Sequence, residues 1–178
     1  MVIEVELRTF ISQKKYEELL DYFAKEGVVQ GVEEQETWYF NAPVDLRIQR
    51  STAHAKVWLK KGKMHAEHRE EFEVLCKRED FDTLAKIFFT LGYGIKIKWL
   101  RLRKNFLWKG ISVSVDHTKG YGFILELEKK CEPSVQEAVL KELKTAIQSL
   151  AIVLSSQEDF DQAFSEYSKN WKTLLEEK

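Results

Sequence analysis

Near its start, the chain has a short segment, residues 3–8, in which charged and apolar side chains alternate. Successive side chains of a β-strand point to opposite faces of the sheet. Glu4, Glu6 and Arg8 therefore share one face, and the apolar residues between them share the other. Two carboxylates and a guanidinium are an unusual set of side chains for one face of one strand. A sheet with one solvent-exposed face can carry such a set as well.

The same alternation recurs in most of the strands that the sequence predicts. These strands are expected at 44–50, 55–61, 68–75, 95–108, 110–117 and 121–129, with a further strand at 33–40. An ordinary solvated face would be a mixture rich in Ser, Thr and Lys. Here Arg and carboxylates dominate, and the polar faces carry Asp45, Arg47, Gln49, Trp58, Lys60, Arg69, Glu71, Glu73, Arg101, Arg103, Ser112, Ser114, Asp116, Glu126 and Glu128.

Two arrangements of these charged faces remain open at this point. In an open sheet, the charged residues would be solvated surface residues. In a sheet that closes into a barrel, they would face one another, and like charges would be costly unless they were paired, hydrated or neutralised by a ligand. Acidic clusters suit Mg²⁺ or Mn²⁺ with oxygen ligands, and clustered Arg and Lys suit phosphate. A closed sheet would thus indicate a site for a metal-bound polyphosphate.

Helices are needed to cover the apolar faces, and apolar residues at helical spacing predict four of them. The second helix is expected to start at Asp80 and to bury Leu84, Ile87, Phe88 and Leu91. The third is expected to begin with a capping box formed by Ser134 and Glu137. The predicted helices lie at 13–26, with Ser12 as cap and Gly27 as end, at 80–91, after Ser134, and from about Ser156.

Length and composition favour one globular domain over residues 1–178, with 44% hydrophobic and 32% charged residues. A net charge of −1 gives no global field toward nucleic acid or an anionic membrane. Two distant cysteines indicate neither a disulfide framework nor a zinc site, so we expect a reduced, cytoplasmic location. No apolar run is long enough to span a membrane, and the acidic start is unlike a signal peptide. A homodimer remains open.

Several segments, in order and over nearly the full chain, resemble the CYTH superfamily. Its members include class IV adenylate cyclases, thiamine triphosphatases and related triphosphate tunnel metalloenzymes. Glu4-Val5-Glu6-Leu7-Arg8 resembles the family's Glu-x-Glu-x-Lys signature. Further segments that resemble family motifs are 37–41, 46–49, 58–62, the Arg-x-Glu-x-Glu stretch at 69–73, 101–106, and the run that contains Asp116, Gly120 to Phe123 and Glu126-Leu127-Glu128.

The resemblance implies an α+β fold, a closed antiparallel β-barrel or tunnel of about eight strands with helices packed on its outside. It also implies that charged side chains inside the barrel bind a small-molecule triphosphate with Mg²⁺ or Mn²⁺. The implied metal ligands are Glu4, Glu6, Glu71, Glu73, Asp116, Glu126 and Glu128. The implied phosphate ligands are Arg8, Arg47, Lys60, Arg69, Arg101 and Arg103, and Glu4, Glu6, Lys60 and Arg103 are implied to be catalytic.

Three functions follow from this resemblance. The first is a metal-dependent phosphohydrolase acting on inorganic, thiamine or nucleoside triphosphate, and the second is a class IV adenylate cyclase. Hydrolysis is favoured over cyclisation because nothing in the chain marks a pocket for a base and ribose. The third function is a non-catalytic polyphosphate or nucleotide binder, suggested by departures from the family pattern.

These departures concern charge and hydroxyl groups. Arg8 and Arg101 replace family lysines, and an arginine cannot act as a proton carrier. Gln49 stands where many members have a second Arg, Thr37 replaces an Asp, and Phe106 lacks the hydroxyl of the usual Tyr.

Overall fold

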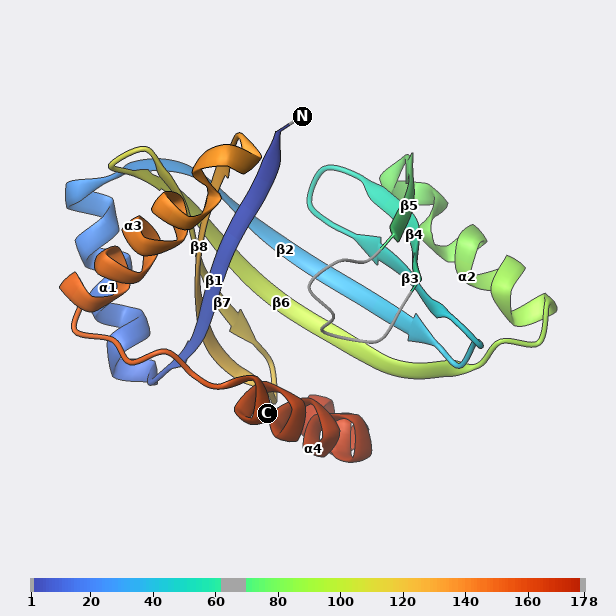
Figure 1. Cartoon of the computed structure of the whole chain (residues 1–178). Coiled ribbons are helices and arrows are strands. Elements are labelled where there is room, and N and C mark those ends of the chain that lie inside the picture. Colours follow the sequence, from blue (N-terminus) through green and yellow to red (C-terminus); the bar gives the residue numbers. More distant parts are fainter. Residues whose placement is uncertain (1, 62–69, 177–178) are drawn as a thin grey trace. The chain divides into compact units, whose positions relative to one another are not determined.

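The computed structural model describes residues 2–61 and 70–176 and contains strands and helices throughout this part of the chain (Figure 1). The strands are β1 (Ile3–Ile11), β2 (Val28–Phe40), β3 (Asp45–Arg50), β4 (Ala55–Lys61), β5 (Glu70–Cys76), β6 (Ile95–Trp108), β7 (Ile111–Thr118) and β8 (Gly122–Cys131). The α-helices are α1 (Gln13–Glu26), α2 (Phe81–Thr90), α3 (Gln136–Ser149) and α4 (Gln157–Glu176).

The strands form one eight-stranded sheet in the order β1-β8-β7-β6-β2-β3-β4-β5. Each pairing with a defined register is antiparallel. The predicted α+β class is therefore confirmed, while closure of the sheet into a barrel stays a prediction. Strand β2 begins at Val28, five residues before the expected position 33. Within the described ranges, no helix is both long and apolar enough to cross a membrane.

The chain divides into two compact units. Unit 1 comprises residues 1–32 and 102–167, and unit 2 comprises residues 33–101 and 168–178. Strands β2 and β6 contribute residues to both units because each strand contains one of the boundaries. The expectation of a single domain stays a prediction, and the two units are described separately below.

In unit 1, helices α1 and α3 cover the apolar face of the sheet (Figure 1). Phe23 of α1, Leu143 of α3 and Leu127 of β8 are fully buried in one cluster. The start of α1 is as predicted, since the Oγ of Ser12 accepts a hydrogen bond from the backbone N–H of Lys15 at 3.1 Å. The alternation in β1 is confirmed: Val5 faces the core under the helices, and the charged residues Glu4 and Glu6 lie on the opposite face of the sheet.

A network of buried hydrogen bonds connects the segment after α3 to β1. Thr9 is fully buried, and its Oγ1 donates to the carbonyl of Val153 at 3.0 Å. The same oxygen accepts the backbone N–H of Ser155 at 2.9 Å, and the Oγ of Ser155 accepts the N–H of Phe10 at 3.0 Å. These bonds satisfy buried polar groups and fix the end of β1, on which the charged residues lie.

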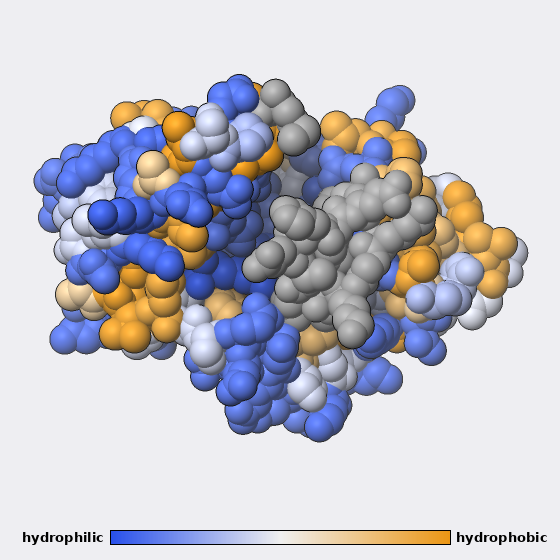
Figure 2. All heavy atoms as spheres, in the orientation of Figure 1, coloured by the Kyte–Doolittle hydropathy of each residue, from blue (hydrophilic) through white to orange (hydrophobic). Residues whose placement is uncertain are grey.

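In unit 2, helix α2 covers strands β3 and β4 of the sheet. Phe81 and Ala85 of the helix are buried against Ile48. The predicted burial of Ile87 and Leu91 is wrong, since these side chains are 49% and 64% exposed. The helix is rotated about its axis relative to the prediction. Its first residue, Phe81, fills the core, so the buried face is the one that contains Phe81. Figure 2 accordingly shows hydrophobic residues on the outward surface over α2.

The cap predicted for α3 is wrong, and the cap predicted for α2 lies at the predicted position with a different hydrogen bond. A 3₁₀ turn over Pro133–Val135 precedes α3, so Ser134 and Glu137 form no capping box and Val135 takes the cap position. Asp80 is the N-cap residue of α2, as predicted, but its side chain accepts the backbone N–H of Lys77 at 3.0 Å and closes a 3₁₀ turn in place of a capping bond to α2. In both cases a tight turn places the polar residue before the first helical turn.

The corrected register of α2 can be tested by unfolding. Phe81→Ala should lower the free energy of unfolding by about 3–5 kcal/mol, because it opens a cavity in the core of unit 2. Leu91→Ala, the matched control on the exposed side of the helix, should change it by less than about 0.5 kcal/mol. Urea denaturation followed by circular dichroism measures both. Equal losses for the two variants would contradict the observed rotation of the helix.

Candidate functional site

The charged face of unit 1 is formed by β1, β6, β7 and β8. Glu6 lies directly opposite Glu128 across the β1–β8 pairing, and Arg8 lies opposite Glu126. Glu4, two residues before Glu6, shares this face. The structure thus brings together four of the predicted metal ligands and one predicted phosphate ligand, as the alternation along β1 and β8 indicates.

Arg103 joins two further predicted residues on this face. Its Nε donates to the carboxylate of Asp116 at 3.0 Å and its Nη2 donates to the same carboxylate at 2.7 Å. The same Nη2 donates to Glu126 at 3.1 Å. The side chain of Asp116 is 1% exposed, and burial is therefore compensated by a two-point ion pair. Burial opposes the charge of Arg103, but the two carboxylates hold its pKa above the ordinary value.

Several carboxylates on this face lie close enough to repel one another. Partial loss of hydration, followed by repulsion from Glu126, raises the pKa of Glu6 to about 7. Partial burial and the neighbouring Glu4 also raise the pKa of Glu128. The side chains of Glu4 and Glu6 nevertheless keep contact with solvent. The face therefore holds crowded, accessible carboxylates whose mutual repulsion a bound cation would relieve.

The donor set of this face fits a hard divalent ion in chemical type. Its available atoms are carboxylate oxygens, which Mg²⁺ and Mn²⁺ prefer. In the part of the chain that the structure describes, no three His, Cys, Asp or Glu side chains are close enough together to hold a metal as they lie. Asp116 is engaged by Arg103, so the carboxylates that suit a metal best are those of Glu4, Glu6 and Glu128.

Arg8 contacts the last helix. Its guanidinium carbon lies 4.8 Å from the centre of the Phe160 ring, and that ring stacks on Phe10 at 4.5 Å. This cation–π contact fixes the arginine beside Glu126 without removing its charge. The predicted role of Arg8 as a phosphate ligand stays a prediction.

The charged face of unit 2 is a row of aromatic and charged side chains across four strands. Tyr39, Arg47, Trp58 and Glu73 are cross-strand neighbours from β2 to β5. The guanidinium of Arg47 stacks on Tyr39 at 4.3 Å and donates to both carboxylate oxygens of Asp45 at 2.7 and 2.6 Å. Arg47 is thus held rigidly among aromatic rings on this face.

The other residues predicted in unit 2 are placed as follows. Lys60 lies opposite Asp45, and Glu73 accepts a hydrogen bond from Lys56 at 2.8 Å. Arg101 is half-buried on β6. Arg69 and the side chain of Glu71 lie outside the described residues.

Lys98 of β6 is a further cation of unit 2. It lies over the ring of Trp38, 4.2 Å from its centre, and Trp38 packs against Phe81 of α2. Lys98 is therefore on the face that α2 covers, and it does not join Arg47 and Trp58.

Two departures from the family pattern meet in the structure. The side-chain amide of Gln49 donates to the Oγ1 of Thr37 at 2.8 Å, and both residues are buried. A neutral hydrogen-bonded pair therefore occupies these two positions. Phe106 is 5% exposed and packs near Phe23 in the core of unit 1, so its missing hydroxyl affects the apolar core and not the charged face.

Sequence analysis missed several residues of these faces. Trp58 was noted on its polar face but given no role, and Tyr39 was treated only as part of a motif. Asn105 accepts a hydrogen bond from Ser114 at 2.9 Å beside the Arg103 network. The period-two alternation contains the signal for Trp58 and Asn105, which share strand parity with Lys60 and Arg103, whereas Tyr39 is placed by its pairing with Arg47.

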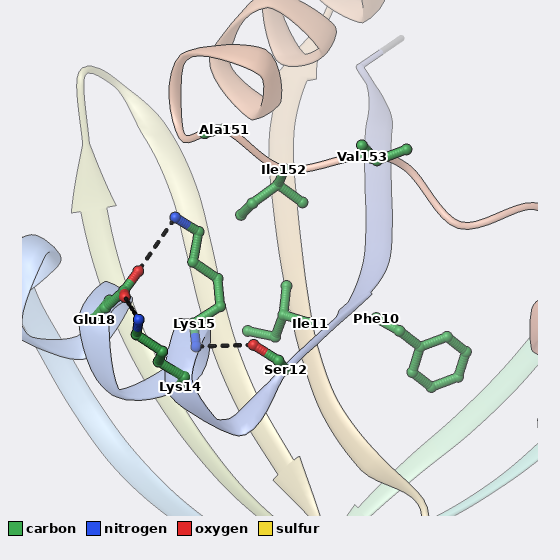
Figure 3. Close-up of a pocket in the computed structure, with 9 residues that line it drawn as sticks. All are labelled: Phe10, Ile11, Ser12, Lys14, Lys15, Glu18, Ala151, Ile152 and Val153. Atoms are coloured by element: carbon green, nitrogen blue, oxygen red, sulfur yellow. Dashed lines mark hydrogen bonds and ion pairs between the residues drawn. The ribbon is translucent and has the colours of Figure 1, made fainter.

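A surface pocket of ≈ 350 Å³ lies elsewhere in unit 1, where β1 meets the start of α1 and residues 151–153 (Figure 3). Lys14 and Lys15 both interact with Glu18, at 3.9 and 3.4 Å. The described lining of the pocket contains none of the predicted site residues. We therefore place the candidate site on the charged faces.

A family comparison agrees with this arrangement of charged strands. The model of the CYTH domain matches residues 2–165. The chain belongs to the CYTH domain family. No curated protein sequence matches this CYTH chain.

Solved structures show the same fold at low sequence identity. A conserved hypothetical protein from Pyrococcus furiosus is 22% identical, with a TM-score of 0.68, and the match covers 88% of this chain and 94% of that one. A candidate adenylyl cyclase from Hippeastrum, described as having a dominant triphosphatase activity, is 19% identical with a TM-score of 0.63 and coverage of 89% and 94%. A candidate adenylate cyclase from Bacillus halodurans is 15% identical with a TM-score of 0.62 and coverage of 87% and 93%.

The Arg103 network predicts a large difference between two ion pairs. Asp116→Ala should lower the free energy of unfolding by about 3 kcal/mol, because it leaves a largely buried guanidinium short of its main partner. Glu142→Ala removes the exposed pair with Lys129 and should cost less than about 1 kcal/mol. Thermal and urea unfolding measure both variants. A loss for Asp116→Ala no larger than that for Glu142→Ala would contradict the network.

Proposed function

We propose that this CYTH protein is a divalent-metal-dependent phosphohydrolase that acts on small molecules carrying a triphosphate. The observation that supports this most is the charged face of unit 1. It combines accessible carboxylates that repel one another with Arg103, whose position is set by hydrogen bonds to two further carboxylates, Asp116 and Glu126. Carboxylates of this kind suit a metal ion, and an arginine held in this way suits a phosphoryl group.

CYTH proteins are metal-dependent in general, and we propose Mg²⁺ or Mn²⁺ for this chain. Such an ion would neutralise charge on phosphoryl oxygens. Glu4, Glu6 and Glu128 would hold it through carboxylate oxygens. Asp116 and Glu126 orient the guanidinium of Arg103, so that its permanent charge stabilises a phosphoryl group as negative charge develops there.

Further cations are proposed as phosphate ligands on sequence grounds. These are Arg8 in unit 1, with Arg47, Lys60, Arg69 and Arg101 elsewhere in the chain. Arg47 is held by Asp45 and Tyr39, which fixes the orientation of its planar fork before a ligand binds. We also propose a cytoplasmic location, which fits the free thiols of Cys76 and Cys131.

A class IV adenylate cyclase is the second candidate, supported by the names of two structural neighbours. In that reaction the ribose 3′-hydroxyl of ATP attacks the α-phosphorus and pyrophosphate leaves. The same carboxylates and arginines would serve it, so product analysis is needed to separate the two reactions.

The assay uses the whole chain with inorganic triphosphate, thiamine triphosphate and ATP, each with Mg²⁺ or Mn²⁺. We expect release of orthophosphate, and Arg103→Ala should lower kcat/KM by about 10²–10³-fold because the charge on the phosphoryl group loses its partner. Lys129→Ala, which removes an exposed pair on the same sheet, should leave the rate unchanged.

Other products or none would decide against hydrolysis. Cyclic AMP from ATP supports the cyclase, and tight binding without turnover supports a non-catalytic binder. If no triphosphate binds, and Glu4→Ala and Arg103→Ala change only the stability of the protein, the proposal is overturned.

A further inference from the structure

Trp58 lies in the middle of the charged face of unit 2. On strand β4 it is opposite Arg47 on one side and Glu73 on the other, and its side chain is 6% exposed. Lys56 and Lys60, two residues away in each direction, share its face. The Nζ of Lys56 lies 4.5 Å from the ring centre, and the guanidinium carbon of Arg47 lies 5.7 Å from it. Cations therefore surround the indole.

The indole N–H of Trp58 is buried and has no acceptor among the residues that the structure describes. Burying a donor in this way is unfavourable, so its presence on this face calls for an explanation. The neighbouring carboxylates serve other donors. Asp45 accepts two bonds from Arg47, and Glu73 accepts one from Lys56.

Trp108 shows how different the surroundings of Trp58 are. Its N–H is also buried without an acceptor, but it lies in the apolar core of unit 1 beside the rings of Tyr22 and Phe23. Packing alone explains that indole. Around Trp58, by contrast, the side chains of Arg47 and Lys56 are donors that cannot accept hydrogen bonds. The described side chains around the indole therefore offer it no acceptor.

The ligand that suits such a face offers several acceptors and no donors. The oxygens of an ionised phosphate meet this description and also match the charge of the neighbouring cations. Solvent reaches this row, since the side chains of Lys56 and Glu73 are 23% and 37% exposed. A phosphate can thus approach by displacing the carboxylate of Glu73 from its exposed pair with Lys56.

We propose that the indole N–H of Trp58 donates a hydrogen bond to a phosphoryl oxygen of the substrate, beside Arg47 and Lys60. This inference rests on the proposed function, in which the chain binds a triphosphate. It adds a neutral donor to a set of ligands that is otherwise cationic. A neutral N–H contributes direction to binding without adding charge, so it favours one placement of the phosphate chain over others.

The test measures binding of inorganic triphosphate with Mg²⁺ by calorimetry at fixed ionic strength. Trp58→Phe keeps an aromatic ring and removes the N–H, and we expect the Kd to rise about tenfold. Trp108→Phe, which removes a buried N–H in the core of unit 1, should leave the Kd unchanged. Both variants lose part of a buried ring and should therefore unfold below the temperature of the wild-type protein, so Trp108→Phe controls for the loss of packing.

A second variant protects the test against a change in packing. Replacing Trp58 by benzothienylalanine, which has the shape of tryptophan with sulfur in place of N–H, should raise the Kd as Trp58→Phe does. Wild-type affinity in this variant would overturn the inference.

The remaining outcomes separate this inference from the proposed function. Wild-type protein that binds no triphosphate overturns both. Wild-type protein that binds it, with equal affinity in Trp58→Phe, overturns only the role of Trp58. Weaker binding of ATP but not of inorganic triphosphate in Trp58→Phe would assign the N–H to the base, and so would also overturn a contact with phosphate.

Discussion

Repulsion between carboxylates on one face of unit 1 is the constraint on which the proposed site depends. The alternation in β1 and β8 commits Glu6 and Glu128 to adjacent positions on the same face. The apolar residues between them are needed under α1 and α3, so the charges cannot move to the other side without emptying the core. Arg103 neutralises Asp116 and Glu126, but Glu4, Glu6 and Glu128 remain crowded.

Such crowding destabilises the protein unless something binds there. A protein that only needed stability would place apolar or oppositely charged residues at these positions. Retention of the carboxylates is therefore explained most simply by a bound cation, and the neighbouring arginines explain why that cation would carry a phosphate ligand. Similar reasoning applies to unit 2, where the buried indole N–H of Trp58 has no acceptor among the described residues.

Much of this arrangement can be predicted from the alternation of apolar and charged residues along each strand, which assigns every second side chain to the same face of the sheet. The alternation of β1 correctly assigns Val5 to the core and Glu6 to the charged face, and Gly27 ends α1 as predicted. Pairings between strands could not be predicted, because they depend on register. The bond between Gln49 and Thr37 joins residues twelve positions apart and appears only once β2 and β3 are aligned.

The errors have a similar cause. The predicted apolar face of α2 comprised Leu84, Ile87, Phe88 and Leu91. The structure buries Phe81 in the core and leaves Ile87 and Leu91 exposed. The short 3₁₀ turn before α3 moved its cap to Val135, and the one before α2 left Asp80 at the cap position but took its side-chain hydrogen bond. In each case the packing partner, which a single sequence does not reveal, decided between local alternatives of similar free energy.

Direct measurement of Mn²⁺ binding tests the central claim, that crowded carboxylates in unit 1 hold a divalent cation. Electron paramagnetic resonance can count bound Mn²⁺ on wild-type protein, on Glu6→Gln and on Glu142→Gln, a control that removes a carboxylate from the exposed pair with Lys129. We predict that the wild-type protein and Glu142→Gln bind the ion with equal affinity and that Glu6→Gln binds it at least about tenfold more weakly. Equal binding by all three proteins, or no binding by the wild type, would contradict the claim.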